Sequence, residues 1–140
     1  MSKTGKIIGA VIVLPIGIFV VLIVFQWLFL DNRLARSKSQ GAEFGKTTDY
    51  NGCQAEGISR IRNLSPQNSL EGLRAEYFVR GCLETSRPSP DFCDGVPIKP
   101  PHIQVYDDWK NEECKKLGWA EMSPNCRTVL RARLDFCEKQ

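Results

Sequence analysis

The sequence predicts an all-α protein in which a single N-terminal transmembrane helix is followed by a small, disulfide-stapled helical domain of about four helices with a proline-rich loop. Three observations favour this class. The run Ile7–Leu30 contains no charged side chain, all 6 cysteines follow it, and apolar residues in the remaining chain recur at helical spacing between capping signals.

The run Ile7–Leu30 predicts the membrane helix. At about 1.5 Å per residue it would be roughly 36 Å long, enough to cross a hydrocarbon core of about 30 Å. Secretory signals have shorter apolar regions that end at a cleavage site with small residues, whereas Asp31 and Arg33 follow here. We therefore interpret the run as an uncleaved signal-anchor, and Ala10 and Gly17, which share a face, as candidate contacts with a neighbouring helix.

The cysteines decide the expected orientation, because basic residues are nearly balanced across the run. These basic residues are Lys3 and Lys6 before it and Arg33, Arg36 and Lys38 after it. A group of 6 cysteines beyond the run is typical of an oxidising compartment. We expect residues 1–6 in the cytoplasm, 7–30 in the cell inner membrane, 31–47 as a juxtamembrane stalk and 48–140 as a periplasmic Cys-rich domain. The alternative is the mitochondrial inner membrane, with the domain in the intermembrane space.

Net charge argues against nucleic acid as a partner. The formal charge is +3, from 19 basic and 16 acidic residues. Setting aside Lys3 and Lys6, which precede the membrane run, leaves 17 basic against 16 acidic residues. No clustered basic excess or nucleic-acid-binding motif accompanies this balance.

Three segments lead from the membrane run to the middle of the domain. The segment 31–47 is polar and mixed in charge, so it is expected to form a stalk or a continuation of the anchor helix. The first helix of the domain ends at Ser65-Pro66, and the second begins near Asn68 with Glu71 as its capping box and ends near Gly81. The residues expected to face the core are Cys53, Ile58, Ile61 and Leu64 in the first helix and Leu70, Leu73, Tyr77 and Phe78 in the second.

Two further helices are expected in the second half of the domain. The third runs over 105–117, with acidic residues in its first turn, lysines in its last turn and Gly118 just past its end. The fourth begins at Ser123-Pro124. Its apolar stripe comprises Cys126, Val129, Leu130, Leu134 and Cys137. On the opposite side Arg127, Arg131 and Asp135 predict a solvated face with modest ion pairing, and partner binding by Arg127 and Arg131 is the alternative.

The segment 87–102 holds most of the chain's prolines and predicts an extended connection rather than a helix. It either wraps the domain as a rigid connection, which we favour, or docks on a partner. The prolines named as candidate partner contacts are Pro97, Pro100 and Pro101.

The cysteines form two C-x10-C spans, each ending in a similar tetrapeptide, Asp91-Phe92-Cys93-Asp94 and Asp135-Phe136-Cys137-Glu138. In a helix Cys126 and Cys137 would be roughly 16 Å apart, whereas a disulfide needs Cα atoms about 4.4–6.8 Å apart, so these two cannot bond to each other. Prolines interrupt the other span, which could therefore close locally. The expected pairs are Cys82–Cys93, Cys114–Cys126 and Cys53–Cys137, although the sequence permits other pairings.

The spacing of the two spans resembles the twin C-x9-C helical hairpins of mitochondrial intermembrane-space proteins. Both spans are one residue longer than that pattern, and only the second is expected to be helical. The resemblance implies an oxidising intermembrane space as the alternative location, and it implies no activity.

Residue patterns for catalysis are absent from the sequence. There is no C-x-x-C for thiol exchange, no closely spaced ligand pair for zinc and no glycine-rich phosphate loop. His102 is the single histidine, and its place in the proline-rich segment favours a surface role over a catalytic one. We therefore expect no enzymatic activity, no cofactor, no metal site and no small-molecule substrate.

Together these observations predict a non-enzymatic, single-pass accessory or structural subunit of a larger envelope complex, whose partners are other membrane subunits. A tethered periplasmic binding module or enzyme inhibitor is the first alternative. A mitochondrial inner-membrane subunit with an intermembrane-space domain is the second. A redox or metal-handling protein, suggested by the cysteines alone, is the third.

Overall fold

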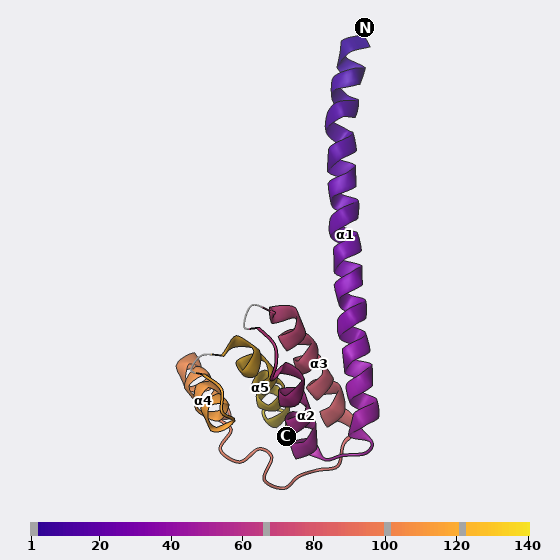
Figure 1. The fold of residues 1–140 in the computed structure, drawn as a ribbon. Helices are drawn as coiled ribbons and strands as arrows, with labels where there is room; N and C mark the ends of the chain where they lie inside the picture. Colours follow the sequence, from indigo (N-terminus) through magenta and orange to yellow (C-terminus); the bar gives the residue numbers. More distant parts are fainter. Residues whose placement is uncertain (1–2, 66–67, 100–101, 121–122) are drawn as a thin grey trace. The chain divides into compact units, whose positions relative to one another are not determined.

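The computed structural model describes the backbone of residues 3–65, 68–99, 102–120 and 123–140, and side chains from Gly17 onward within these ranges. Within them the fold is all-α, as predicted, with five helices and no strand (Figure 1). The helices are α1 (Lys3–Gly45), α2 (Tyr50–Ile61), α3 (Ser69–Thr85), α4 (Ile103–Lys116) and α5 (Pro124–Cys137). The chain divides into two compact units, Met1–Arg33 and Leu34–Gln140.

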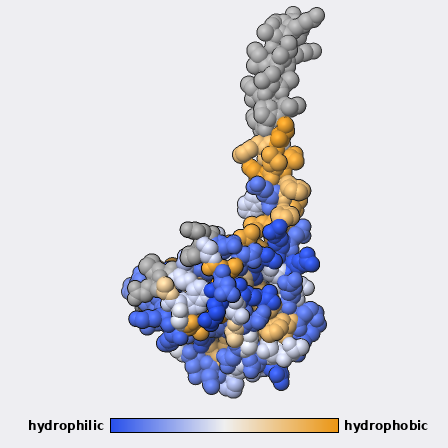
Figure 2. All heavy atoms as spheres, viewed as in Figure 1, coloured by the Kyte–Doolittle hydropathy of each residue, from blue (hydrophilic) through white to orange (hydrophobic). Residues whose placement is uncertain are grey.

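The first unit contains the apolar part of α1. Among the described residues, only this helix is both long and apolar enough to cross a membrane, judged by length and composition. Its large apolar side chains between Ile18 and Leu30 are exposed. In Figure 2 the described residues of this stretch are mostly orange, whereas the second unit shows a mostly blue surface. Exposed apolar side chains along a whole helix are what a lipid environment requires.

The second unit begins with the end of α1. Residues 34–45 continue the apolar helix, which is one of the two expectations for segment 31–47, but they pack against the domain instead of forming a free stalk. Leu34 and Ser37 are buried, and Thr85 donates a hydrogen bond of 2.7 Å to the carbonyl oxygen of Ala42. Phe44 packs against Phe78 of α3, with ring centroids 5.7 Å apart. This segment is therefore part of the folded domain and contributes one of its helices.

Glycines allow α1 and α3 to cross at very short range. A Cβ atom on Gly41 would lie 1.9 Å from the carbonyl oxygen of Phe78, and one on Gly81 would lie 2.0 Å from the carbonyl oxygen of Lys38. Real Cβ atoms do not approach backbone that closely, so both positions require glycine. The spacing of Ser37, Gly41 and Gly45 along α1 is the sequence signal for this crossing.

Helix α3 lies at the centre of the second unit and packs against α2 and α5, while α4 packs against α5 (Figure 1). It continues past the predicted end at Gly81, because that glycine fits against α1 instead of ending the helix. Leu70, Leu73 and Tyr77 are only half-buried. The apolar side chains that α3 buries, against α1 on one side and α2 and α5 on the other, are Ala75, Phe78, Val79, Cys82 and Leu83.

Some of the predicted helix ends are observed and others are not. Asp49 caps α2 by accepting a hydrogen bond of 2.8 Å from the N–H of Gly52. The capping box predicted at Asn68 does not form, since Glu71 instead pairs with Arg74 at 2.7 Å. Leu117 is the C-cap of α4, and Gly118 follows it with a φ of 81°, a left-handed conformation that favours glycine just past the end of a helix.

The last two helices keep most of their predicted features. Helix α4 begins at Ile103, two residues earlier than expected, so its paired acids lie beyond its first turn. The lysines Lys115 and Lys116 do lie in its last turn. The predicted apolar stripe of α5, which comprises Cys126, Val129, Leu130, Leu134 and Cys137, is entirely buried.

Three disulfides cross-link the second unit, and only one of them pairs as expected. Cys114–Cys126 joins α4 to α5, with Cα atoms 6.0 Å apart. The predicted pairs Cys82–Cys93 and Cys53–Cys137 are wrong. The structure has Cys53–Cys82 and Cys93–Cys137 instead, with Cα separations of 5.7 and 5.5 Å.

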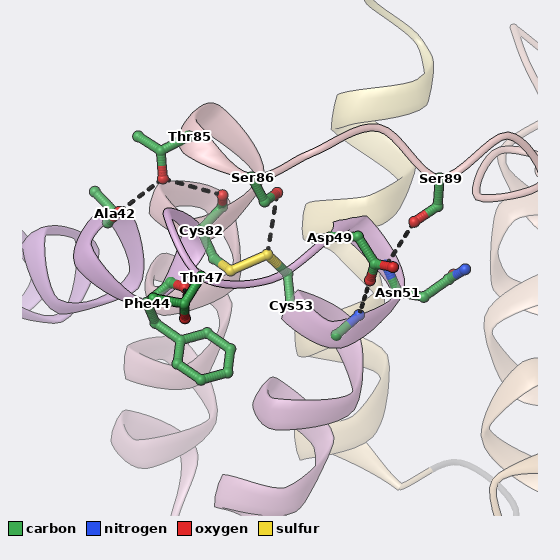
Figure 3. The surroundings of a disulfide bond; sticks show 11 residues. Ala42, Phe44, Thr47, Asp49, Asn51, Cys53, Cys82, Thr85, Ser86 and Ser89 are labelled. Carbon is green, nitrogen blue, oxygen red and sulfur yellow. Dashed lines mark hydrogen bonds between the residues drawn. A yellow bond between two sulfur atoms is a disulfide. The ribbon is translucent and has the colours of Figure 1, made fainter.

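The tertiary fold explains this exchange of partners. The first turn of α2 lies against the last turn of α3, which places Cys53 beside Cys82 (Figure 3). Two backbone hydrogen bonds of 3.1 Å hold Arg87 against Thr48 and Tyr50. Because Arg87 is held there, the following chain leads away from Cys82 and brings Cys93 to the end of α5.

The two similar tetrapeptides meet in space. Cys93 and Cys137, one from each copy, form a disulfide, and the rings of Phe92 and Phe136 beside them lie 5.9 Å apart. Tyr50 completes the aromatic cluster, with centroids 5.5 Å from Phe92 and 4.8 Å from Phe136. The two similar tetrapeptides thus provide the two halves of one cross-link, with the ring of Phe92 in the core and the ring of Phe136 packed against it.

The proline-rich segment is packed onto the domain over its first half. Phe92 and Val96 are buried. Arg133 of α5 donates hydrogen bonds to the carbonyl oxygens of Phe92, at 2.7 Å, and Asp94, at 3.3 Å. It also pairs with Glu113 of α4 at 3.3 Å. This arginine therefore joins the segment to two helices, which agrees with the wrapping role predicted for it.

Candidate docking hollow

A hollow of about 660 Å³ opens between α3 and α5 at the edge of the last turns of α1. Its apolar lining residues are Leu73, Tyr77, Leu83 and Phe136. Its charged lining residues are Lys38, Glu76, Arg80, Glu84, Arg131, Asp135 and Lys139. We call it the α3–α5 hollow.

An ion-pair network around the buried side chain of Glu76 forms one wall of the α3–α5 hollow. The guanidinium of Arg80 lies 2.5 Å from the Oε1 atom of Glu76 and 2.5 Å from the Oδ2 atom of Asp135. Glu76 is only 2% exposed. Burial works to lower the pKa of Arg80, but the hydrogen bonds to Glu76 and Asp135 outweigh burial, so its pKa is raised. These charges are held in place by the packing of α3 against α5.

Three hydrogen-bond donors of the hollow are left available. Arg131 is 53% exposed, and its guanidinium is 3.9 Å from the Oε2 atom of Glu76, beyond hydrogen-bond distance. Within the described ranges, Lys139 has no acidic partner and the hydroxyl of Tyr77 has no hydrogen bond. By contrast, Lys38 is paired with Glu84 at 2.7 Å.

The two arginines of the predicted basic edge of α5, Arg127 and Arg131, have different neighbours. Arg127 pairs with Asp107 of α4 at 2.5 Å, and Lys110 binds the same carboxylate at 2.8 Å. Hydrogen bonds from Lys110 and Arg127 lower the pKa of Asp107. Arg127 therefore joins α4 to α5 in this structure, and only Arg131 faces the α3–α5 hollow.

Of the other predicted contact residues, Pro97 is described within the second unit and does not line this hollow. Pro97 is half-buried, while Pro100 and Pro101 lie outside the described residues. The side chain of Ala10 lies outside them as well. Gly17 is exposed, and a Cβ atom built on it would meet no atom within 4 Å.

Sequence reasoning missed the central members of the site. The signal available was the spacing of Glu76 and Arg80, which are i and i+4 on one helix and therefore pair readily. The sequence places Asp135 on a solvated face of α5, because no local pattern links it to α3. The pairing of Arg80 with Asp135 depends on how α5 packs against α3.

The reactive chemistry offered by the described residues is limited. All cysteines are in disulfides, so no thiolate is available for exchange. In the part of the chain that the structure describes, no three side chains of His, Cys, Asp or Glu are grouped to hold a metal ion. What the α3–α5 hollow offers is a set of available hydrogen-bond donors beside apolar side chains, which suits recognition of another molecule.

No protein-family model, curated protein or solved structure matches this chain.

Proposed function

We propose that this chain is a non-enzymatic, single-pass accessory or structural subunit of a larger protein complex in the cell inner membrane. In this proposal the N-terminus is cytoplasmic and the second unit is periplasmic. The three disulfides support an oxidising compartment for that unit. The exposed apolar stretch of α1 supports membrane anchoring.

One observation carries the proposal: helix α1 contains both the apolar stretch and the segment that is packed into the disulfide-linked domain. Residues 34–45 are held by the glycine crossing with α3, by Thr85 and by Phe78. A binding domain that needs free reach is usually connected through a flexible linker. Here the packed segment begins at Leu34, with three residues between it and the end of the apolar stretch at Leu30, so little chain is left for a linker, which suits a subunit of a membrane assembly.

The experiment is purification of the full chain from its native membrane in several mild detergents. Stoichiometric co-purification of the same membrane proteins in each detergent is expected. A chain that is clean and monomeric in every detergent would refute the proposed function. Orientation is tested separately with a protease added to intact spheroplasts, which should cleave the second unit only if it lies outside the cytoplasm.

A second candidate function is favoured by the α3–α5 hollow, namely a tethered module that binds a soluble periplasmic protein or inhibits an enzyme. This function predicts that the soluble periplasmic fraction competes with binding to the full chain in nanodiscs. A partner found only among integral membrane proteins would argue against it. The mitochondrial inner membrane remains the alternative location, and fractionation of the source cells tests it directly.

A further inference from the structure

We infer that the α3–α5 hollow is the surface through which the second unit binds a different protein, and that this partner inserts an acidic side chain between Arg131 and Lys139. The inference rests on the proposed function, and it adds the binding surface and the chemistry of the partner.

The charges inside the hollow favour an acidic partner. Each lining Asp or Glu side chain already has a short contact with a cation, since Arg80 binds Glu76 and Asp135, and Lys38 binds Glu84. The acids of the hollow therefore do not need a further cation. Arg131 and Lys139 lack a hydrogen-bonded acid within the described ranges. An incoming carboxylate would supply it.

Arg131 is suited to receive a carboxylate. Its planar guanidinium can donate two parallel hydrogen bonds to one carboxylate. The Oε2 atom of Glu76, buried and without a hydrogen bond in the described structure, lies 3.9 Å away and attracts the guanidinium without occupying its donors. The hydroxyl of Tyr77 lines the same hollow and adds a further donor.

The apolar part of the lining favours a protein over a free anion. Leu73, Tyr77 and Phe136 stand beside the charged groups. Tyrosine and arginine next to apolar side chains are the residue types that dominate protein–protein binding energy. A small inorganic anion would leave these apolar side chains uncovered, whereas a polypeptide carrying an acidic residue covers them.

The test uses a water-soluble carbodiimide on native membranes that contain the full chain. This reagent joins a lysine amine to a nearby carboxyl group as an amide, and the elements of one water molecule pass to the carbodiimide, which becomes a urea. The expected product joins Lys139 to an Asp or Glu of a different polypeptide, identified by peptide sequencing. A cross-link to a second copy of this chain, or none at Lys139, would overturn the inference.

Charge reversal gives the second measurement. Arg131→Glu and, separately, Lys139→Glu should each lower recovery of that partner by about tenfold or more, because attraction becomes repulsion. Lys115→Glu is the matched control, since Lys115 is an exposed lysine of α4 away from the hollow. Each variant is first checked for three intact disulfides and an unchanged melting temperature.

The outcomes separate this inference from the proposed function. If the wild-type chain retains stoichiometric partners but both reversals bind them normally, the hollow is not the surface and only the inference fails. Equal loss of partner in the Lys115→Glu control would also overturn it. If the wild-type chain has no partner, the proposed function itself fails.

Discussion

Replacing Gly81 with alanine tests the claim that residues 34–45 of α1 are an integral part of the domain. The added Cβ atom would lie 2.0 Å from the carbonyl oxygen and 2.8 Å from the carbonyl carbon of Lys38. Carbon–oxygen contacts between packed helices are normally about 3.3–3.6 Å, so the two helices must separate by more than about 1 Å. Neither atom can rotate away, because both belong to the backbone.

The magnitude follows from two opposed effects. Overpacking of this kind costs about 1–3 kcal/mol or more, and a backbone clash belongs at the upper end. Alanine in place of glycine inside a helix stabilises the folded state by about 1 kcal/mol, because alanine has the higher helix propensity. The net loss should therefore be about 2 kcal/mol, which corresponds to a fall in melting temperature of roughly 8–16 °C for a domain of this size.

The assay is thermal unfolding of the full chain in detergent, with disulfides intact, followed by circular dichroism. Gly17→Ala is the matched control, since it makes the same exchange in α1 where no atom lies within 4 Å. Gly41→Ala, on the other side of the crossing, should be destabilising but not additive with Gly81→Ala, because either one alone separates the helices. If Gly81→Ala melts at or above the wild-type temperature, the close crossing is refuted.

Three further predictions concern the charges and cross-links of the second unit. Arg80→Met should lower the free energy of unfolding by about 2–3 kcal/mol in urea titrations, since it leaves the buried Glu76 carboxylate without its charged donor; an unchanged midpoint would contradict the network. The pKa of Asp107 is lowered below its ordinary value of 3.8 in the folded state, so the stability it contributes is present above pH 3.8 and is lost as the pH falls through its folded pKa. Asp107→Asn should therefore destabilise the protein at neutral pH and make less difference in strong acid, as measured by unfolding at both pH values. Replacing both cysteines of Cys93–Cys137, which are 44 residues apart, should cost about 4 kcal/mol, and replacing both of Cys114–Cys126, 12 apart, about 3 kcal/mol; the opposite order in denaturant unfolding would contradict the loop-entropy argument.

Local sequence signals predicted the helices well because their causes are local. The helical period of the buried residues in α5 identified its core face correctly, and Ser123-Pro124 marked its start. Gly118 marked the end of α4, since a positive φ there is a property of one residue. The length of the apolar stretch of α1 and its lack of charged residues were likewise enough to predict a helix there.

The candidate site was only partly predictable, because it depends on contacts between different helices. Arg131 and Arg127 looked equivalent along α5, yet Asp107 binds Arg127 and leaves Arg131 beside the hollow. Gly81 looked like a helix end and is instead a close contact with α1. No pattern along one helix can show which residue of another helix it will meet.

By itself the sequence determined the helical class, the apolar helix and the oxidised character of the domain, because hydrophobic period, capping and cysteine number act over a few residues or through composition. The tertiary structure alone decided which cysteines bond, where the domain begins and which charges remain available. Those properties depend on contacts between residues far apart in the chain, such as Cys53 with Cys82 and Lys38 with Gly81, and packing selects these only when the whole domain folds.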